Sequence, residues 1–118
     1  MSAANSNKSL LAVIWSSSDK EVARNNVFTY TLNARCRDWW SDVHLVIWGP
    51  SVKLAAHDSE IQNQLRDILK AGVSICACDK HAAEHKVADN LRNLGITVHG
   101  VDEPVREMLR NGAKVITF

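Results

Sequence analysis

Short apolar segments alternate with segments of helical periodicity along most of the chain. The apolar segments have the length of β-strands. The most apolar of them are continuously hydrophobic, which is typical of strands buried on both faces of a parallel sheet. The five predicted strands are Leu10–Trp15, Val43–Trp48, Val73–Cys78, Ile96–His99 and Lys114–Phe118. The pattern predicts one three-layer α/β/α domain, in which helices cover both faces of a five-stranded parallel sheet.

The segments between the predicted strands carry helix signals. Ser18 and Glu21 fit a capping box, and Asp58 or Ser59 can cap a later helix. The predicted helices span residues 18–37, 51–56, 58–71, 79–94 and 102–111. Their apolar stripes are Ala23, Val27, Tyr30 and Ala34; Ile61, Leu65, Ile68 and Leu69; Ala83, Val87, Leu91 and Leu94; and Val105, Met108 and Leu109.

Composition and charge narrow the function classes. The 118 residues are 46% hydrophobic and suffice for one core. Lys and Arg number 14 and Asp and Glu 13, so no charge excess favours a nucleic acid or an anionic membrane as partner. The longest apolar run, Leu10–Trp15, is too short to cross a bilayer. Residues 1–8 are small and polar and predict a flexible N-terminus before a domain at 9–118.

The three cysteines are Cys36, Cys76 and Cys78. An odd number, with two of them one residue apart, is a poor framework for disulfides, so we expect free thiols and a cytoplasmic protein. In open α/β sheets, ligands bind beyond the carboxyl ends of the strands, and Cys78 lies at such an end. Cys76 points to the same face, and we expect it to lie deeper in the core.

A helix predicted to begin at Asp79 directly follows Cys78. Its free N–H groups and dipole favour a negative charge, and therefore the nucleophilic thiolate. His81, one turn along, can pair with the thiolate, whereas the Asp79 carboxylate opposes it. The alternative is that Cys78 is a small buried apolar residue, as cysteine commonly is.

The segment from Trp48 to Lys53 is a second candidate site. Gly49 allows a ligand to approach the backbone, and Ser51 and Lys53 can meet an anionic group. The alternative is an ordinary strand-ending turn in which Pro50 starts a helix. No glycine-rich nucleotide motif and no nucleophile elbow follows a predicted strand.

Histidines add one more alternative. The set Cys76, Cys78, His81 and His85 can be considered for metal binding, but its spacing departs from paired zinc ligands, so we expect neither metal nor cofactor. His44, His57 and His99 have no partner at a suggestive spacing, and we expect them to be structural.

Four segments of the chain resemble the DsrE/DsrF-like family of small sulfur-relay proteins. They are Val46–Ser51, Glu60–Ala71, Gly72–Cys78 and Leu94–Ile96, and the similarity extends from about Leu10 to Phe118. The resemblance implies the strand order 4-3-2-1-5 and assembly into trimers or hexamers. In this family the cysteine that ends the third strand, where present, accepts sulfur as a persulfide and passes it between partner proteins. The matching residue is Cys78.

The resemblance therefore implies a sulfur carrier or sulfurtransferase with donor and acceptor proteins as partners. Around Cys78, the expected substrate-binding residues are Gly49, Pro50, Ser51, Lys53, Lys80 and His81. Relatives often carry a second cysteine shortly after the first, whereas Asp79 to His81 follow here, and some family members lack the cysteine. A cysteine-independent ligand-binding or assembly module on the same fold is the alternative. A redox or metal-binding protein is a third class.

Overall fold

Five parallel strands form the centre of the fold. They are β1 (Leu10–Trp15), β2 (Asp42–Ile47), β3 (Ser74–Cys78), β4 (Thr97–His99) and β5 (Lys114–Thr117). Their order is β4-β3-β2-β1-β5, and every pair is parallel. The predicted fold class and strand order are confirmed, and each strand begins and ends within about one residue of its prediction, the uncertainty usual for element boundaries. The computed structural model describes residues 10–118, so the predicted flexible N-terminus at residues 1–8 lies outside the described residues.

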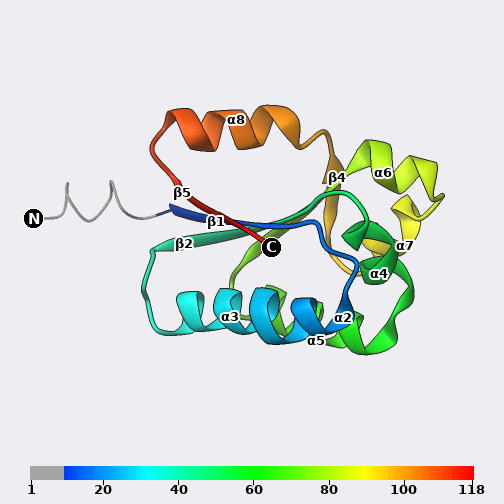
Figure 1. Cartoon of the computed structure of the whole chain (residues 1–118), viewed down its shortest axis with the longest axis horizontal. Helices are drawn as coiled ribbons and strands as arrows, with labels where there is room; N and C mark the ends of the chain where they lie inside the picture. The colour runs from blue at the N-terminus through cyan, green and yellow to red at the C-terminus, as the bar shows by residue number, and fades with distance from the viewer. Residues whose placement is uncertain (1–9) are drawn as a thin grey trace, which may run out of the picture.

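Helices cover the two faces of this sheet unequally. In chain order they are α2 (Lys20–Val22), the π-helical segment η1 (Ala23–Phe28), α3 (Thr29–Cys36), α4 (Ser51–His57), α5 (Ser59–Lys70), α6 (Asp79–Glu84), α7 (Ala88–Asn93) and α8 (Asp102–Arg110). Figure 1 shows α3 and α5 on one face of the sheet and α8 by itself on the other. This division follows from the strand order. The connections from β1 to β4 all move in one direction across the sheet, whereas the connection from β4 to β5 moves in the opposite direction, so a right-handed crossover places its helix on the other face.

Successive residues of a strand point to opposite faces of the sheet and so belong to two separate apolar clusters. The larger cluster takes Leu11, Val13 and Trp15 from β1 and lies beneath most of the helices. The smaller cluster, on the face of α8, consists of Ile14, Val46, Cys78, Val101 and Val105. Val105 is the one buried residue of α8, which makes this face thinly covered.

Leu109 does not join Val105 and Met108 against the sheet, although the sequence places it on the same stripe. It is 56% exposed, whereas Met108 packs against the smaller cluster. A single helix on a wide sheet face buries only a narrow line of side chains, and Leu109 lies outside that line.

The first helix differs from its prediction at its start and in its middle. Asp19, not Ser18, is the N-cap: its carboxylate accepts hydrogen bonds from the N–H groups of Glu21 and Val22 at 2.8 and 3.2 Å. The π-helical segment η1 then changes the angular spacing of the side chains. Phe28 is buried as a result, and Tyr30 is only partly buried.

The helix predicted at residues 79–94 is two short helices, α6 and α7. Lys86 adopts a left-handed conformation with φ of 57°, which ends α6. Val87 then turns back, donates its N–H to the Ala82 carbonyl at 2.9 Å and is buried. Ala82 is buried as well, and Ala83, which was predicted to be buried, is exposed.

Candidate functional site

Cys78 lies at the junction where β3 ends and α6 begins. It is a free thiol and is 4% exposed, because Val101 and Val105 pack over the same cluster. The carboxyl end of β3 is thus the place that the sequence predicted, but in this conformation the thiol is covered. The coverage comes from the start of α8, a segment more than 20 residues further along the chain.

Cys76 is the more accessible of the two thiols on this strand. The expectation that it lies deeper than Cys78 is wrong, because α8 covers the end of β3 more closely than its middle. Cys76 is partly buried and lines a cavity. Burial raises the pKa of the Cys76 thiol to about 11, and the neighbouring sulfur of Cys78 adds to the rise. Cys76 is therefore a protonated thiol at neutral pH.

His99 is the residue beside Cys78 that sequence reasoning missed. It ends β4 and is the register partner of Cys78 across the β3–β4 ladder. The Nδ1 atom of His99 lies 2.7 Å from the carbonyl oxygen of Gly100. In the tautomer with its proton on Nδ1, His99 donates this hydrogen bond, and Nε2 keeps its lone pair.

A signal for this pairing was present in the sequence. Two strands that both end at a titratable residue, and that are neighbours in the order 4-3-2-1-5, bring those residues together. Spacing along the chain gives no such signal, because Cys78 and His99 belong to different elements.

The two residues predicted to assist Cys78 from α6 are placed differently from each other. Lys80 is exposed, and His81 is partly buried. Within the part of the chain that the structure describes, the buried Nδ1 atom of His81 has no hydrogen-bond partner. Strand pairing fixes the position of His99 next to Cys78, whereas His81 is carried by α6.

The predicted ligand loop after β2 is built mainly as a structural connection. Ser51 is fully buried, and its hydroxyl donates to the Trp15 carbonyl oxygen at 2.6 Å. Gly49 has φ of 96°, a conformation that glycine tolerates best, and approaches Ser16 of the neighbouring loop. The Ser51 hydroxyl is therefore committed to this connection and is not free to bind a ligand in this conformation.

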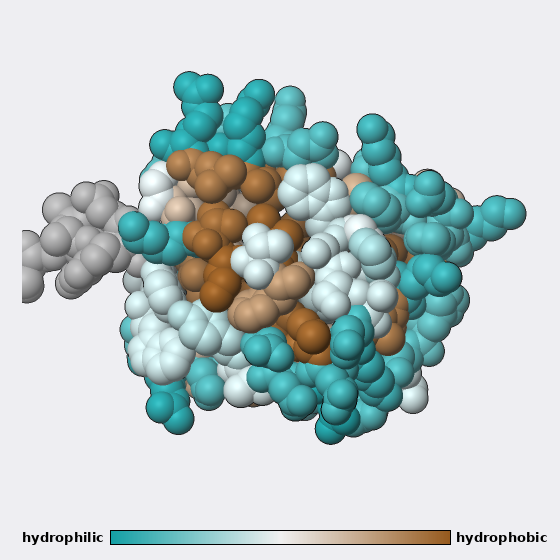
Figure 2. Space-filling view, in the orientation of Figure 1, coloured by the Kyte–Doolittle hydropathy of each residue, from teal (hydrophilic) through white to brown (hydrophobic). Residues whose placement is uncertain are grey.

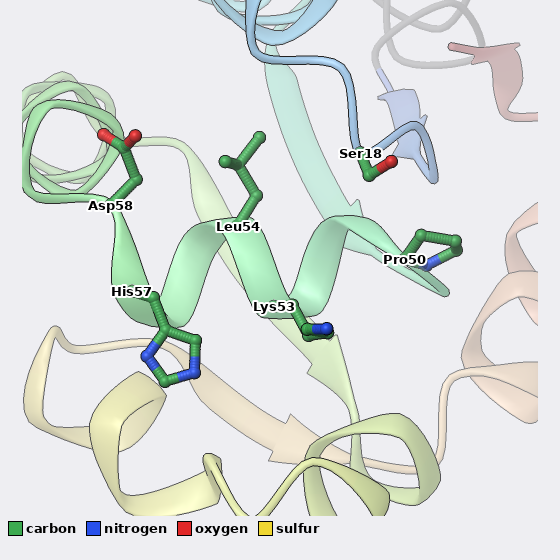
Figure 3. Close-up of a pocket in the computed structure, with 6 residues that line it drawn as sticks. All are labelled: Ser18, Pro50, Lys53, Leu54, His57 and Asp58. Atoms are coloured by element: carbon green, nitrogen blue, oxygen red, sulfur yellow. The ribbon is translucent and has the colours of Figure 1, made fainter.

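Pro50 and Lys53 do line an open hollow of about 510 Å³ along α4. Figure 3 shows Lys53 and His57 on one side of this helix and Leu54 and Asp58 on the other. Cys78, Lys80 and His81 are not among the residues that line this hollow. The residues predicted to act together are thus divided between the hollow beside α4 and the junction of β3 with α6.

Residues 10–118 contain neither a metal-binding cluster nor a helix able to span a membrane. No group of three or more His, Cys, Asp or Glu side chains in this range is arranged to hold a metal ion. In the same range, no helix has the length and apolar character needed to cross a membrane.

Solved structures place this geometry among known folds. No model of a known protein family matches the chain, and no curated protein matches it either. Two solved structures share the fold at low sequence identity. The ychN protein from E. coli is 14% identical over 94% of this chain and 99% of its own, with a TM-score of 0.72. MTH1491 from Methanobacterium thermoautotrophicum, a protein of unknown function, is 19% identical over 94% of this chain and 99% of its own, with a TM-score of 0.62. Both have the DsrE/DsrF-like fold, so the fold that the resemblance implied is confirmed.

A third structure is similar in sequence as well. BT1422 from Bacteroides thetaiotaomicron, a conserved protein of unknown function, is 35% identical over 100% of this chain and 98% of its own, with a TM-score of 0.90. The chain therefore belongs to the same family as BT1422.

Proposed function

We propose that the protein is a sulfur carrier that accepts sulfur on Cys78. The thiolate of Cys78 attacks the terminal sulfur of a donor persulfide, R–S–SH; the S–S bond of the donor breaks, and R–S⁻ leaves and takes up a proton. Cys78–S–SH forms, and no external oxidant or reductant is consumed. The observation that supports this most directly is the pairing of Cys78 with His99 at the ends of neighbouring strands.

His99 has the chemistry to assist this step. With Nδ1 donating to the Gly100 carbonyl, Nε2 can accept the proton of the Cys78 thiol. The same imidazolium can then donate a proton to the departing thiolate. Lys80, exposed in the first turn of α6, adds positive charge near the incoming donor.

The cover over Cys78 suits a carrier that releases sulfur only to a partner. Val101 and Val105 exclude water and small oxidants from the site while α8 is in place. A donor or acceptor protein that docks beside α8 and displaces its first turn exposes the sulfur. We therefore propose sulfur donor and acceptor proteins as the partners.

An assembly of several copies is part of the same proposal. Figure 2 shows apolar side chains gathered in the middle of one face, below α8. β5 is an edge strand of the sheet, and its residues Val115 and Ile116, like Phe118 after them, are only partly buried. An apolar edge of this kind supports a homo-oligomer, a trimer or hexamer as the resemblance implies. A monomer in light scattering at micromolar concentration would contradict this part.

The decisive experiment is mass spectrometry after incubation with cysteine persulfide. We expect one added sulfur atom on the peptide that contains Cys78, transferred while α8 is transiently displaced from the thiol. Cys78→Ser should abolish the addition, while Cys36→Ser, at an exposed cysteine, should leave it unchanged. An unmodified Cys78 in the wild-type protein, alone and with a candidate partner, would overturn the proposal.

A second candidate function is a cysteine-independent binding module, supported by the burial of Cys78 and the hollow beside α4. Lys53 and His57 give that hollow a capacity to hold a small anion, since the Asp58 carboxylate that also lines it is paired with Lys20. If Lys53→Ala weakens the binding of inorganic phosphate while Cys78→Ser has no effect and no sulfur is accepted, this module is the better description.

A further inference from the structure

A second cavity lies on the thinly covered face of the sheet, beneath α8. Its volume is about 280 Å³. Strand residues His44, Cys76, Thr97 and His99 line it from one side, and Pro104 and Met108 of α8 from the other. Cys78 is not among the lining residues, so the cavity does not reach the covered thiol, although His99 lies beside both.

The walls of this cavity suit an uncharged molecule. Among the described residues that line it, none is Lys, Arg, Asp or Glu. An ion placed here loses hydration and finds no opposite charge to replace it. Hydrogen-bonding capacity is nevertheless present in the Thr97 hydroxyl and the His44 imidazole.

The same walls favour an aromatic ring. The thioether of Met108 makes favourable contacts with aromatic rings, and imidazoles such as those of His44 and His99 are flat rings on which an aromatic ring can stack. The cavity volume is at the small end of the range for ligand sites, which corresponds to a molecule of one or two rings.

We propose that this cavity binds a small uncharged aromatic molecule that carries one hydrogen-bonding group, with Cys76 in its wall. The site goes beyond sulfur transfer, because it requires neither Cys78 nor a partner protein. Binding here places the ligand between α8 and the sheet, next to the helix that covers Cys78.

Cys76 provides a chemical probe of the site. In disulfide exchange, its thiolate attacks one sulfur of a probe Ar–S–S–Ar; Cys76–S–S–Ar forms, and Ar–S⁻ leaves. The uncharged probe is 4,4′-dithiodipyridine, and the charged one is 5,5′-dithiobis(2-nitrobenzoate). We expect the preference for the uncharged probe to be at least about tenfold greater at Cys76 than at exposed Cys36, because Cys76 is partly buried in a cavity that has no charged side chain in its lining.

Protection by a non-reactive ligand tests binding itself. Indole, which is uncharged and has one N–H donor, should slow the modification of Cys76 and leave that of Cys36 unchanged. Indole-3-carboxylate, its charged analogue, should protect Cys76 far less. The same protection should persist in Cys78→Ser, which separates this site from the proposed sulfur carrier.

Two variants of α8 form a matched pair. Met108→Trp fills the cavity and should abolish protection by indole, whereas Leu109→Trp adds the same group on the exposed side of the helix and should not. Met108→Phe is the milder substitution if Met108→Trp does not fold, as judged by circular dichroism. Equal probe preferences at Cys76 and Cys36, or indole protection that survives in a folded Met108 variant, would overturn the proposal.

Discussion

The buried hydroxyl of Ser51 donates a 2.6 Å hydrogen bond to the carbonyl oxygen of Trp15. The same carbonyl also accepts the N–H of Trp48 at 3.0 Å, and the N–H of Ser51 donates to the Ser16 carbonyl at 3.1 Å. These bonds join the end of β1 to the loop after β2 and to the start of α4. A serine that looks like a ligand-binding residue in the sequence therefore acts as a connection between two loops.

Ser51→Ala should lower the free energy of unfolding by about 1 kcal/mol. The cost stays moderate because Trp48 continues to satisfy the Trp15 carbonyl. Urea denaturation followed by circular dichroism measures the change. Ser59→Ala, an exposed serine at the first turn of α5, is the control and should change stability by less than about 0.5 kcal/mol. Equal stability of the two variants would contradict this role for Ser51.

His99→Gln should slow sulfur acceptance on Cys78 by about tenfold or more, since it removes the proposed proton acceptor. His81→Gln, on α6, should slow it by less than about twofold if His99 is the proton acceptor. The measurement is the initial rate of persulfide formation at Cys78 by mass spectrometry. A larger loss of rate with His81→Gln than with His99→Gln would show that His81, the residue that the sequence suggested, is the proton acceptor.

Val105→Ala should expose Cys78 and speed its alkylation by iodoacetamide several-fold, because Val105 packs over the thiol. The lost methyl groups should also lower the free energy of unfolding by roughly 1.5 kcal/mol. Leu109→Ala, on the exposed side of the same helix, is the control and should change neither quantity appreciably. Peptide mapping separates Cys78 from the other cysteines. If alkylation of Cys78 does not change, α8 is not its cover.

The sheet could be predicted because its signals are local. Each strand is an apolar run, and each connection carries helix periodicity, so the α/β class follows from the sequence, and the resemblance supplies the order. The break between α6 and α7 gives no such signal. Lys86 is an ordinary helix-forming residue, and its left-handed conformation is stabilised by the return of Val87 to the core.

The site was less predictable because it depends on how elements pack. The relative burial of Cys76 and Cys78 is set by the path of α8, and the two cysteines look equivalent on one strand face. His99 becomes a neighbour of Cys78 only through strand pairing. Both relationships join residues more than 20 positions apart, beyond the range of helix and strand periodicity.

Asp58→Asn should remove part of the acid sensitivity of the fold. The Asp58 carboxylate accepts a hydrogen bond from the N–H of Ile61 and pairs with Lys20, whose Nζ lies 3.0 Å from Oδ2. Both interactions, the first more than the second, lower the pKa of the Asp58 carboxyl below its ordinary value of 3.8. The stabilisation from this carboxylate is therefore present above pH 3.8 and is lost as the pH falls through the lower pKa of the folded state.

Asparagine retains the N-cap of α5 but not the charge, so the variant isolates the ionic part. Urea denaturation between pH 2 and 6 should show a smaller loss of stability on acidification in Asp58→Asn than in the wild type. Asp67→Asn, at an exposed acid on the same helix, is the control. Identical pH profiles for wild type and Asp58→Asn would contradict the prediction.

Cys76 should react with iodoacetamide at a rate that keeps rising through the whole alkaline range in which the protein stays folded. Only the thiolate reacts, and the pKa of about 11 keeps its fraction small at neutral pH. Below that pKa, each unit of pH raises the thiolate fraction, and hence the rate, by about tenfold. The rate for a thiol with the ordinary pKa of 9.0 would instead level off near that pH.

Peptide mapping at a series of pH values from 7 to 10, with circular dichroism to verify folding, gives the profile. In Cys78→Ser the curve should move to slightly lower pH, because the neighbouring sulfur contributes to the raised pKa. A plateau near pH 9 in the folded wild-type protein would show that the Cys76 thiol is not desolvated by its surroundings.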